Sequence, residues 1–468
     1  MTATYPDESN KPSKSFPGPS ATRPGYLPKL AKSPWIAPPP EGYVFHNAKV
    51  VDAASGSLLD GLQTVVVIKG VISAVTPSGT WKGDVNQRLE TVDVSGLYIC
   101  PGLIDAHVHV SSVPGVKNMT ELVYHTPEET VALRQTYTLR EMIHRGFTTV
   151  RDTGGASKSL ANALAEGLIV GPRLFQCGKA ISQSGGHGDF SPAIKRNGGG
   201  ADHPGCCGGY SLSLGRVADG VPDVLRATRE ELMAGADFIK IMVGGGVLSE
   251  TDAIESVQYS AEEVRACTQT AKAMGGRLVT AHAYTDEAIL HAVNNGAGGI
   301  EHGNLMSAET AYMMAKKGIY LTPTLSCYGI MVRKPWEDFL PESGQVKNWE
   351  VMENGLKALK VAHDAGVTIC YGSDLLISMQ ALQTEEFTVR SEVLPSAAIL
   401  RHATINPAKM LKQEGKLGVV APGAIADLIF LDENPLDDIT VLDRPEDHLK
   451  AVVKDGRVIT SKISGLKA

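Results

Sequence analysis

The sequence lacks the features that mark several classes of protein. None of its apolar runs approaches the roughly 20 residues that a membrane-spanning helix needs, and its first residues lack the apolar core of a secretory signal. The formal net charge of −7 argues against nucleic acid as a partner. The seven cysteines are odd in number and irregularly spaced, which is typical of reduced thiols. We therefore expect a cytoplasmic protein that binds neither nucleic acid nor a membrane.

The chain divides into regions of different composition. Residues 1–42 are rich in proline, serine and lysine and cannot pack a core alone, so this arm is either disordered or extended over a neighbouring surface. Residues 43–100 and 415–468 consist of short strand patterns separated by glycine turns. Two strand-rich ends around a different middle predict one small β-sandwich domain built from both ends of the chain.

The middle of the chain, residues 101–414, alternates between short apolar runs and stretches of helical periodicity, for example residues 130–144, 261–274 and 348–365. The apolar runs end near His109, Asp152, Ile181, Val243, His282, His302, Leu325 and Asp374. Strand–helix units repeated eight times predict the α/β class and a (β/α)8 TIM barrel. A doubly wound open sheet is the alternative, but the count of eight and the absence of an early Gly-x-Gly-x-x-Gly turn favour the barrel.

The segment Pro101-Gly-Leu-Ile-Asp-Ala-His-Val-His-Val110 is the most informative in the chain. Its β-branched residues fit a buried strand, and no helical period fits them. Side chains two residues apart on a strand point to the same face, so His107 and His109 project together at the end of this strand. Two converging neutral imidazoles form half of a metal site. The alternative is a pair of hydrogen-bonded core histidines.

Later apolar runs contain four more polar residues with ligand or catalytic chemistry: Lys240, His282, His302 and Asp374. Barrel enzymes place their sites at the C-terminal ends of the strands. Each residue alone has a structural explanation, which is an ion pair for Lys240, a helix N-cap for Asp374 and a core position for either histidine. Their joint occurrence at the ends of different strands favours one common site.

The chemistry of this set suits a pair of metal ions. Four imidazoles and one carboxylate fit borderline-soft divalent ions, with zinc as the first choice and cobalt or manganese as alternatives. One ion cannot use all of these groups and keep an open position for water, whereas two bridged ions can. A lone ammonium at Lys240 is costly to bury. Reaction of its amine with carbon dioxide would give an anionic carbamate, which is a suitable bridging ligand.

Together these motifs resemble the amidohydrolase superfamily. The resemblance rests on Pro-Gly-Leu-Ile-Asp-x-His-x-His, a strand lysine, two later strand-end histidines, a final aspartate and the closing Pro422-Gly-Ala-Ile-Ala-Asp427. It covers nearly the whole chain and implies two divalent metal ions per subunit. The implied ligands are His107, His109 and Asp374 for the first ion, His282 and His302 for the second, and N-carboxylated Lys240 between them. The implied reaction is attack on a carbonyl by a hydroxide that bridges the metals, with Asp374 moving the proton to the leaving group.

Two loops on the expected catalytic face look specialised for substrate. Residues 182–189 contain His187, for which we predict a hydrogen-bond donor role toward the substrate carbonyl or its anion, with an exposed turn histidine as the alternative. Residues 197–210 are glycine-rich and contain Cys206 and Cys207. Arg216 and Lys195 are candidates to hold a substrate carboxylate. An apolar lining is expected from Leu325, Tyr328, Ile330, Met331, Leu375, Leu376 and Met379.

The local sequence around these sites resembles one branch of the superfamily. Gly185-Gly-His-Gly-Asp189 and Lys240-Ile-Met-Val-Gly-Gly-Gly-Val247 resemble the branch of Xaa-Pro dipeptidases and ochratoxin hydrolase. Within it, the sequence is most similar to molinate (thiocarbamate) hydrolase and the phenylurea hydrolases. The resemblance therefore implies a thiocarbamate or phenylurea herbicide as the substrate and a homo-oligomer, of four or more subunits, as the assembly. A dipeptidase or ochratoxin-type amidase is the alternative, and a metal-binding or scaffold barrel is the alternative without catalysis.

Overall fold

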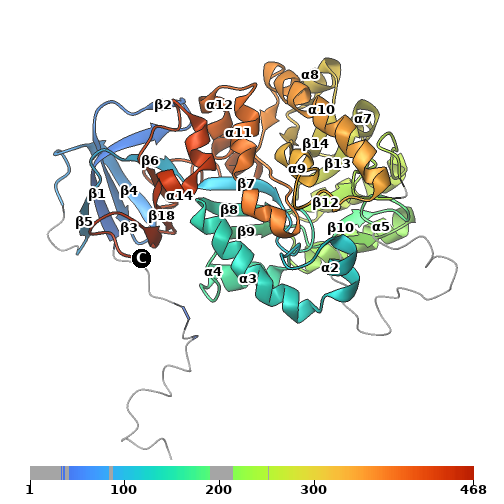
Figure 1. Cartoon of the computed structure of the whole chain (residues 1–468), viewed down its shortest axis with the longest axis horizontal. Coiled ribbons are helices and arrows are strands. Elements are labelled where there is room, and N and C mark those ends of the chain that lie inside the picture. Colours follow the sequence, from blue (N-terminus) through green and yellow to red (C-terminus); the bar gives the residue numbers. More distant parts are fainter. Residues whose placement is uncertain (1–32, 34, 37–41, 84–87, 190–213, 251) are drawn as a thin grey trace, which may run out of the picture.

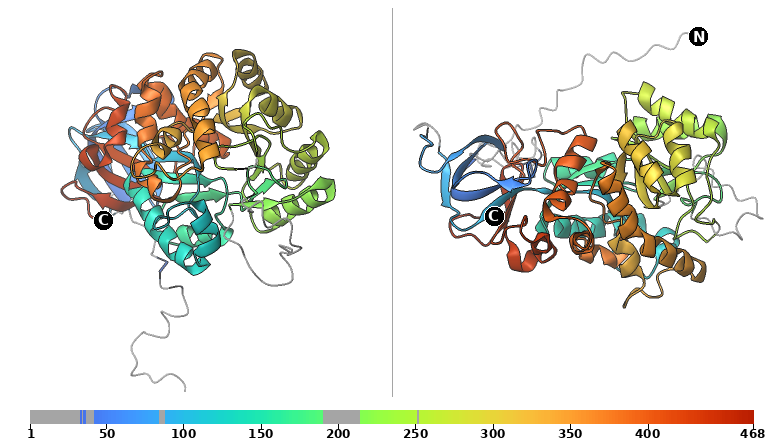
Figure 2. Two further views of the ribbon diagram at one scale, coloured as in Figure 1. Left: turned by 45° about the vertical axis from the view of Figure 1, so that its right-hand side comes forward. Right: turned by 90° about the horizontal axis from the view of Figure 1, so that it is seen from above.

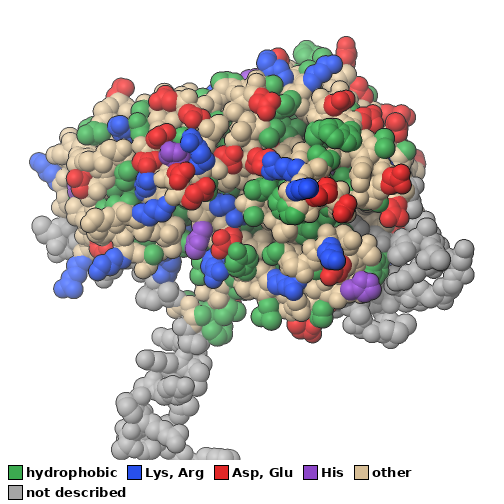
Figure 3. All heavy atoms as spheres, viewed as in Figure 1, with side chains coloured by type: hydrophobic (Ala, Val, Ile, Leu, Met, Phe, Trp, Pro, Cys, Tyr) green, Lys and Arg blue, Asp and Glu red, His purple; other side chains and the backbone are tan. Residues whose placement is uncertain are grey.

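The computed structural model shows two regions that differ in architecture (Figure 1). It describes residues 33, 35–36, 42–83, 88–189, 214–250 and 252–468. Most of the predicted arm lies outside the described residues, as do Lys195 and the glycine-rich loop with Cys206 and Cys207. Within the described ranges, no helix is both long and apolar enough to cross a membrane. On the face drawn in Figure 3, acidic and basic side chains are interspersed.

The first region is a nine-stranded sheet that combines strands from both ends of the sequence, the blue and red strands of Figures 1 and 2. The order is β19-β18-β17-β6-β1-β3-β4, and β2 and β5 also pair with β1. The strands are β1 (Gly42–Asp52), β2 (Ser57–Leu58), β3 (Gln63–Ile68), β4 (Val71–Pro77), β5 (Glu90–Asp93), β6 (Tyr98–Pro101), β17 (Leu428–Leu431), β18 (Leu449–Lys454) and β19 (Arg457–Ser461). The predicted run 451–459 is a hairpin, because Asp455 and Gly456 both have positive φ and form its turn.

Strand β1 connects the two parts of this sheet. Its first residues pair with β3 and β5, and its last residues pair with β6. Phe45 on β1 packs edge-on against Phe430 on β17, with ring centroids 4.9 Å apart. Side chains from the two ends of the sequence therefore share one hydrophobic core.

The second region contains two parallel sheets, ordered β7-β8-β9 and β11-β10-β12-β13-β14-β15-β16. Their strands are β7 (Leu103–Val108), β8 (Phe147–Asp152), β9 (Arg173–Gln176), β10 (Ala180–Ser182), β11 (Gly215–Val217), β12 (Ile239–Met242), β13 (Val279–Thr285), β14 (Gly299–Leu305), β15 (Tyr320–Thr322) and β16 (Thr368–Ile369). Backbone hydrogen bonds link the two sheets at two places: Ala106 N on β7 donates to Tyr371 O, just after β16, and Asp237 N, just before β12, donates to Gln176 O on β9, each at 2.8 Å. The predicted α/β class and alternation are confirmed.

Helices lie outside these parallel strands in the views of Figures 1 and 2. They are α2 (Met119–His125), α3 (Glu128–His144), α4 (Lys158–Ala165), α5 (Gly220–Met233), α6 (Ala261–Ala273), α7 (Asp286–Asn294), α8 (Ala308–Lys317), α9 (Ser326–Met331), α10 (Glu342–Asp364), α11 (Glu385–Ser391), α12 (Ser396–His402), α13 (Ile405–Met410) and α14 (Pro445–His448). Local sequence sets their ends: Ser260 and Glu263 form a capping box that begins α6. Short 3-10 helices, η3 (Ile377–Leu382) and η4 (Ile439–Asp443), precede α11 and α14.

The last two parallel strands end earlier than the sequence predicts. Strand β15 ends at Thr322, because Pro323 has no N–H group to continue the ladder. Strand β16 ends at Ile369, and the chain then pairs with other segments. Asp374 N, for example, donates to His107 O at 2.9 Å. Asp374 therefore follows the strand by five residues and is held against β7 by its own backbone.

Candidate metal centre

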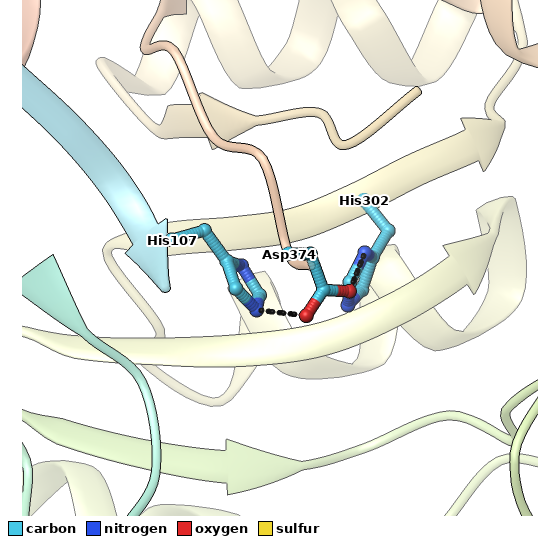
Figure 4. A group of neighbouring side chains, drawn as sticks. All are labelled: His107, His302 and Asp374. Atoms are coloured by element: carbon cyan, nitrogen blue, oxygen red, sulfur yellow. Dashed lines mark ion pairs between the residues drawn. The ribbon is translucent and has the colours of Figure 1, made fainter. Parts of the chain in front are cut away.

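Three predicted ligands meet in one cluster: His107 on β7, His302 on β14 and Asp374 in the segment after β16 (Figure 4). One potential ligand atom from each lies within 4.8 Å of the other two. Asp374 Oδ1 is 3.3 Å from His107 Nε2, and Asp374 Oδ2 is 3.9 Å from His302 Nδ1. The first and last strands of the predicted barrel thus place their polar side chains on one centre.

His109 and His282 extend this cluster on its two sides. His109 Nε2 is also 3.3 Å from Asp374 Oδ1. The ring centroids of His282 and His302 are 4.6 Å apart. The four rings and the carboxylate form one contiguous group.

Two residues of the cluster have backbone conformations that are unusual for their type. His302 has φ 76° and Asp374 has φ 50°, both in the left-handed region. Such conformations cost about 1 kcal/mol or more and persist only where the surroundings enforce them. Beside Asp374, the buried Asp105 carboxylate accepts from Ser373 Oγ at 2.6 Å and anchors this segment to β7. The strain is located at the two positions that aim ligand atoms at the centre.

Both histidines of the His-x-His motif have one ring nitrogen bound to the protein. His107 Nδ1 lies 2.9 Å from Glu301 Oε2, and His109 Nδ1 lies 3.0 Å from Gly154 O. A carbonyl oxygen and an ionised carboxylate only accept, so each Nδ1 donates. In the neutral form of either ring the lone pair is then on Nε2, the nitrogen that lies 3.3 Å from Asp374.

In His282 and His302, too, one ring nitrogen contacts another group of the protein. His282 Nε2 donates to Gly245 O at 2.9 Å, which leaves Nδ1 with the lone pair. His302 Nδ1 lies 2.8 Å from Thr324 Oγ1, a hydroxyl that can donate or accept, so this contact holds the ring without fixing its tautomer. Second partners that fix the ring and its tautomer are the usual surroundings of metal-binding histidines. The donor set therefore fits divalent metal ions.

The charge of Asp374 fits the same conclusion. Burial alone would raise the pKa of its carboxyl, but His107, His109 and His302 outweigh burial and hold the pKa well below its usual value. Asp374 is therefore an anion at neutral pH. The alternative role as a helix N-cap is wrong, because the N-cap of the next helical segment is Leu376.

Lys240 lies on β12, and its side chain is among the largest that are fully enclosed. Burial lowers the pKa of its amine, although Glu301 and Asp374 oppose that shift. Among the described residues, no acidic side chain forms an ion pair with Lys240, so the alternative of a structural ion pair has no partner. A lowered amine pKa favours the neutral, nucleophilic form that reaction with carbon dioxide requires.

The sequence did not point to two residues that hold the ring of His107 in place, one directly and one through the other. Glu301 and Arg151 are each fully buried and form an ion pair. Arg151 also donates to Thr280 Oγ1 at 2.9 Å, and its guanidinium lies 4.3 Å from the ring centroid of Phe238. The available signal was a charged residue inside each of two apolar strands, Val150-Arg151 and Ile300-Glu301, where an unpaired charge is costly.

His187 lies against the cluster, stacked on His282 with ring centroids 4.2 Å apart. Its Nδ1 is 3.0 Å from Ser249 Oγ. Ser249 has one proton, and its other two neighbours, Asp252 Oδ1 and Gly246 O, only accept. His187 Nδ1 therefore donates to Ser249, and Nε2 holds the lone pair. Burial lowers the pKa of His187 to about 4. Its Nε2 can donate a hydrogen bond to a substrate only if the ring carries protons on both nitrogens. The predicted donor role therefore stays a prediction.

The predicted substrate residues have mixed outcomes. Arg216 pairs with Glu230 at 2.6 Å and with Glu231 at 3.0 Å, so its guanidinium is already engaged. The predicted apolar lining is buried, and most of it belongs to one cluster with Tyr284 and Val247. The members of that cluster that the sequence analysis names are Tyr328, Ile330, Met331, Leu375, Leu376 and Met379.

Comparison with known proteins agrees with this geometry. The amidohydrolase family pattern matches residues 98–459. The chain belongs to the amidohydrolase family. Ochratoxinase from Aspergillus niger is 32% identical over 354 residues, which are 74% of this chain and 73% of that protein. This amidohydrolase is therefore a hydrolase that acts on C–N bonds.

Solved structures give the same placement. A prolidase complexed with N-methylphosphonate-L-proline is 40% identical, covers 90% of this amidohydrolase and all of its own chain, and has a TM-score of 0.83. Molinate hydrolase is 20% identical, with a TM-score of 0.69 over 90% of this chain and 95% of its own. Phenylurea hydrolase B is 19% identical, with a TM-score of 0.71 over 89% and 96%. At these lower identities the likeness shows the fold alone.

Proposed function

We propose that this amidohydrolase is a two-metal hydrolase whose parallel sheets close into an eight-stranded (β/α)8 barrel around the metals. The observation that carries the proposal is that four histidines of one contiguous group each have one ring nitrogen held by a protein partner outside that group. The proposed holders are His107, His109 and Asp374 for one ion, His282 and His302 for the other, and N-carboxylated Lys240 between them. Zinc is the first choice for this donor set, with cobalt or manganese as alternatives.

When bound, two such ions would supply a hydroxide nucleophile near neutral pH and polarise the substrate carbonyl. Asp374 is the proton carrier in this proposal. Its Oδ atoms accept the proton of the attacking water and deliver it to the leaving nitrogen. The low pKa of Asp374 keeps the carboxyl ionised, which is the form that can accept a proton. Tyr284, whose ring lies 5.1 Å from that of His302, closes one side of the centre to water.

For the substrate we infer an amide that joins an acyl group to an amino acid, as in a dipeptide. Support comes from the 40% identical prolidase, whose bound phosphonate stands in for a tetrahedral acyl carbon on proline. The relative at 32% identity, ochratoxinase, belongs to the same branch. An uncharged thiocarbamate or phenylurea is the second candidate. Its support is the apolar cluster around Tyr328 and the engagement of Arg216 by two glutamates.

A substrate panel with metal-loaded protein tests these statements. Xaa-Pro and Xaa-Arg dipeptides, a thiocarbamate and a phenylurea are compared after loading with zinc, cobalt or manganese, with and without a chelator. We expect hydrolysis of dipeptides that the chelator abolishes and added metal restores. Hydrolysis of the thiocarbamate or phenylurea alone would identify this uncharged class, rather than dipeptides, as the substrate. Absence of chelator-sensitive hydrolysis throughout, with two metals bound, would overturn the proposed function.

A further inference from the structure

A lysine far along the sequence holds the loop that follows Lys240. Lys347 lies on α10, and its ammonium is 2.8 Å from Gly246 O, 2.6 Å from Ser249 O and 2.8 Å from Asp252 O. The Asp252 carboxylate lies 3.4 Å away and supplies the opposite charge. Side-chain exposure is 13% for Lys347 and 3% for Asp252. One buried cation thus satisfies three carbonyl groups of a loop that forms neither helix nor strand.

The loop and the helix meet by close approach at a second point. A Cβ atom on Gly344, one turn before Lys347, would lie 2.7 Å from Val247 O. Only glycine leaves room there for the loop to rest on the helix. Gly344 and Lys347 are three residues apart and therefore share one face of α10. The loop that follows β12 therefore packs against this face of α10.

The clamped loop sets the orientation of two imidazoles in the site. Gly245 O accepts the Nε2–H of His282, which leaves Nδ1 as the His282 nitrogen that could bind a metal. Ser249 Oγ, next to the carbonyl that Lys347 binds, accepts from His187 Nδ1. A Cβ atom on Gly246 would lie 1.8 Å from His187 Nδ1, so the loop backbone is in direct contact with that ring.

We propose that Lys347 is a positioning residue for the second metal: by clamping residues 244–250 it fixes Gly245 O and, through it, the nitrogen of His282 proposed to bind the metal. The proposal rests on the two-metal function proposed above. Lys347 acts on one side of the centre only. Among the described residues, no hydrogen bond or ion pair joins this loop to His107, His109 or Asp374. Loss of the clamp should therefore weaken the second metal and leave the first in place.

The test is metal binding by Lys347→Met, which keeps the apolar stem and removes the donor. Lys360→Met is the matched control, because Lys360 lies on the same helix and pairs only with Asp364 at its exposed face. Bound zinc per chain is measured after equilibration with buffered free zinc, and cobalt-loaded proteins are compared by their visible absorption spectra. Outer partners of metal ligands are typically worth 10- to 100-fold in affinity. Lys347 does not contact His282 itself but holds the loop that carries its partner. We therefore expect about a 10-fold loss of zinc affinity at the weaker site, an altered cobalt spectrum and unchanged affinity at the tighter site.

Gly344→Ala is the second variant, in case Lys347→Met folds poorly. It adds a methyl group against Val247 O without removing a charge, and alanine favours the helix. Both variants should lose affinity at the same site, and hydrogen exchange of residues 244–252 should increase in both. Two zinc ions bound with wild-type affinity and an unchanged cobalt spectrum in both variants would overturn the role of Lys347. A wild-type protein that binds fewer than two ions would instead overturn the proposed two-metal centre.

Discussion

The Nδ1 atom of His107 lies 2.9 Å from Oε2 of Glu301, and both side chains are buried. Burial alone would raise the pKa of Glu301, but Arg151 and Lys240 outweigh it and hold the pKa well below its usual value. Glu301 is therefore a carboxylate that can only accept. This contact fixes the tautomer of His107 and directs Nε2 toward Asp374. A strand residue adjacent in sequence to one proposed ligand thus orients another proposed ligand.

Glu301→Gln should weaken metal binding at the site of His107. The loss of a carboxylate partner typically lowers metal affinity by about 10- to 100-fold. The same change leaves Arg151 buried without its charge partner, which costs about 3–5 kcal/mol of unfolding free energy. Zinc titration and urea unfolding measure the two effects. Glu309→Gln, an exposed change on α8, is the control.

A double variant separates these two effects. Replacing Arg151 by Met in the Glu301→Gln background removes the unpaired charge and should restore much of the stability. It should not restore metal affinity, because His107 still lacks its carboxylate. Full recovery of zinc binding in the double variant would show that Glu301 acts on the metal only through stability.

Lys240 should make metal binding depend on bicarbonate. The buried amine has a lowered pKa, so a neutral fraction is available to react with carbon dioxide. Protein stripped of metal and bicarbonate should take up the second zinc slowly or incompletely, and added bicarbonate should restore full uptake. Mass spectrometry of the native protein should show one added carbon dioxide. Lys240→Met should bind the second zinc weakly at every bicarbonate concentration, and uptake that ignores bicarbonate would contradict the carbamate bridge.

Asp374→Asn should bind metal and lose turnover. Asparagine keeps an oxygen for coordination but cannot accept a proton, and general acid–base catalysis contributes about 100- to 10,000-fold in rate. We expect kcat to fall within that range while bound zinc stays close to the wild-type amount. Steady-state rates and metal analysis on the same preparation are the measurements. Near-full activity in the variant would remove Asp374 from proton transfer.

The sequence predicts that the proposed ligands share one site because their chemistry and the strand period are local. A His-x-His pair must face one side of a strand, and β7 confirms the strand that it needs. The predicted helices at residues 130–144, 261–274 and 348–365 lie in α3, α6 and α10, although α10 begins six residues earlier, at Glu342. The loop at Val247 packs against the first turns of α10, and the hydrophobic periodicity of the helix itself cannot predict that contact.

The supporting residues escape the sequence because their roles are long-range. Glu301 reaches a histidine 194 positions away, and Lys347 binds a loop about 100 positions away. Neither pairing has a local signature. The same holds for Asp374: its place depends on a hydrogen bond from its backbone to His107 O rather than on the end of a strand. Side-chain chemistry identifies the ligands, whereas chain topology identifies what orients them.

The two regions of the fold are joined by an ion network whose strength should depend on pH. Arg173 on β9 contacts Asp427 and Asp455 of the nine-stranded sheet. Burial alone would raise the pKa of Asp455, but Arg173 and Lys454 outweigh it and hold the pKa below its usual 3.8. A carboxyl with a lowered pKa stabilises the fold above its unfolded pKa, and this contribution is lost as pH falls through the folded value.

Asp455→Asn should therefore cost stability near neutral pH and little in acid. Asparagine tolerates the left-handed backbone at this position, where φ is 51°, so the turn itself is preserved. Because the Asp455 side chain is 45% exposed, we expect a loss of only about 0.5–1 kcal/mol at pH 7. The difference in unfolding free energy from the wild type should shrink as pH falls below 3.8. Urea unfolding at pH 7, 5 and 3 measures it, and a difference that stays constant over this range would contradict the ionised pair with Arg173.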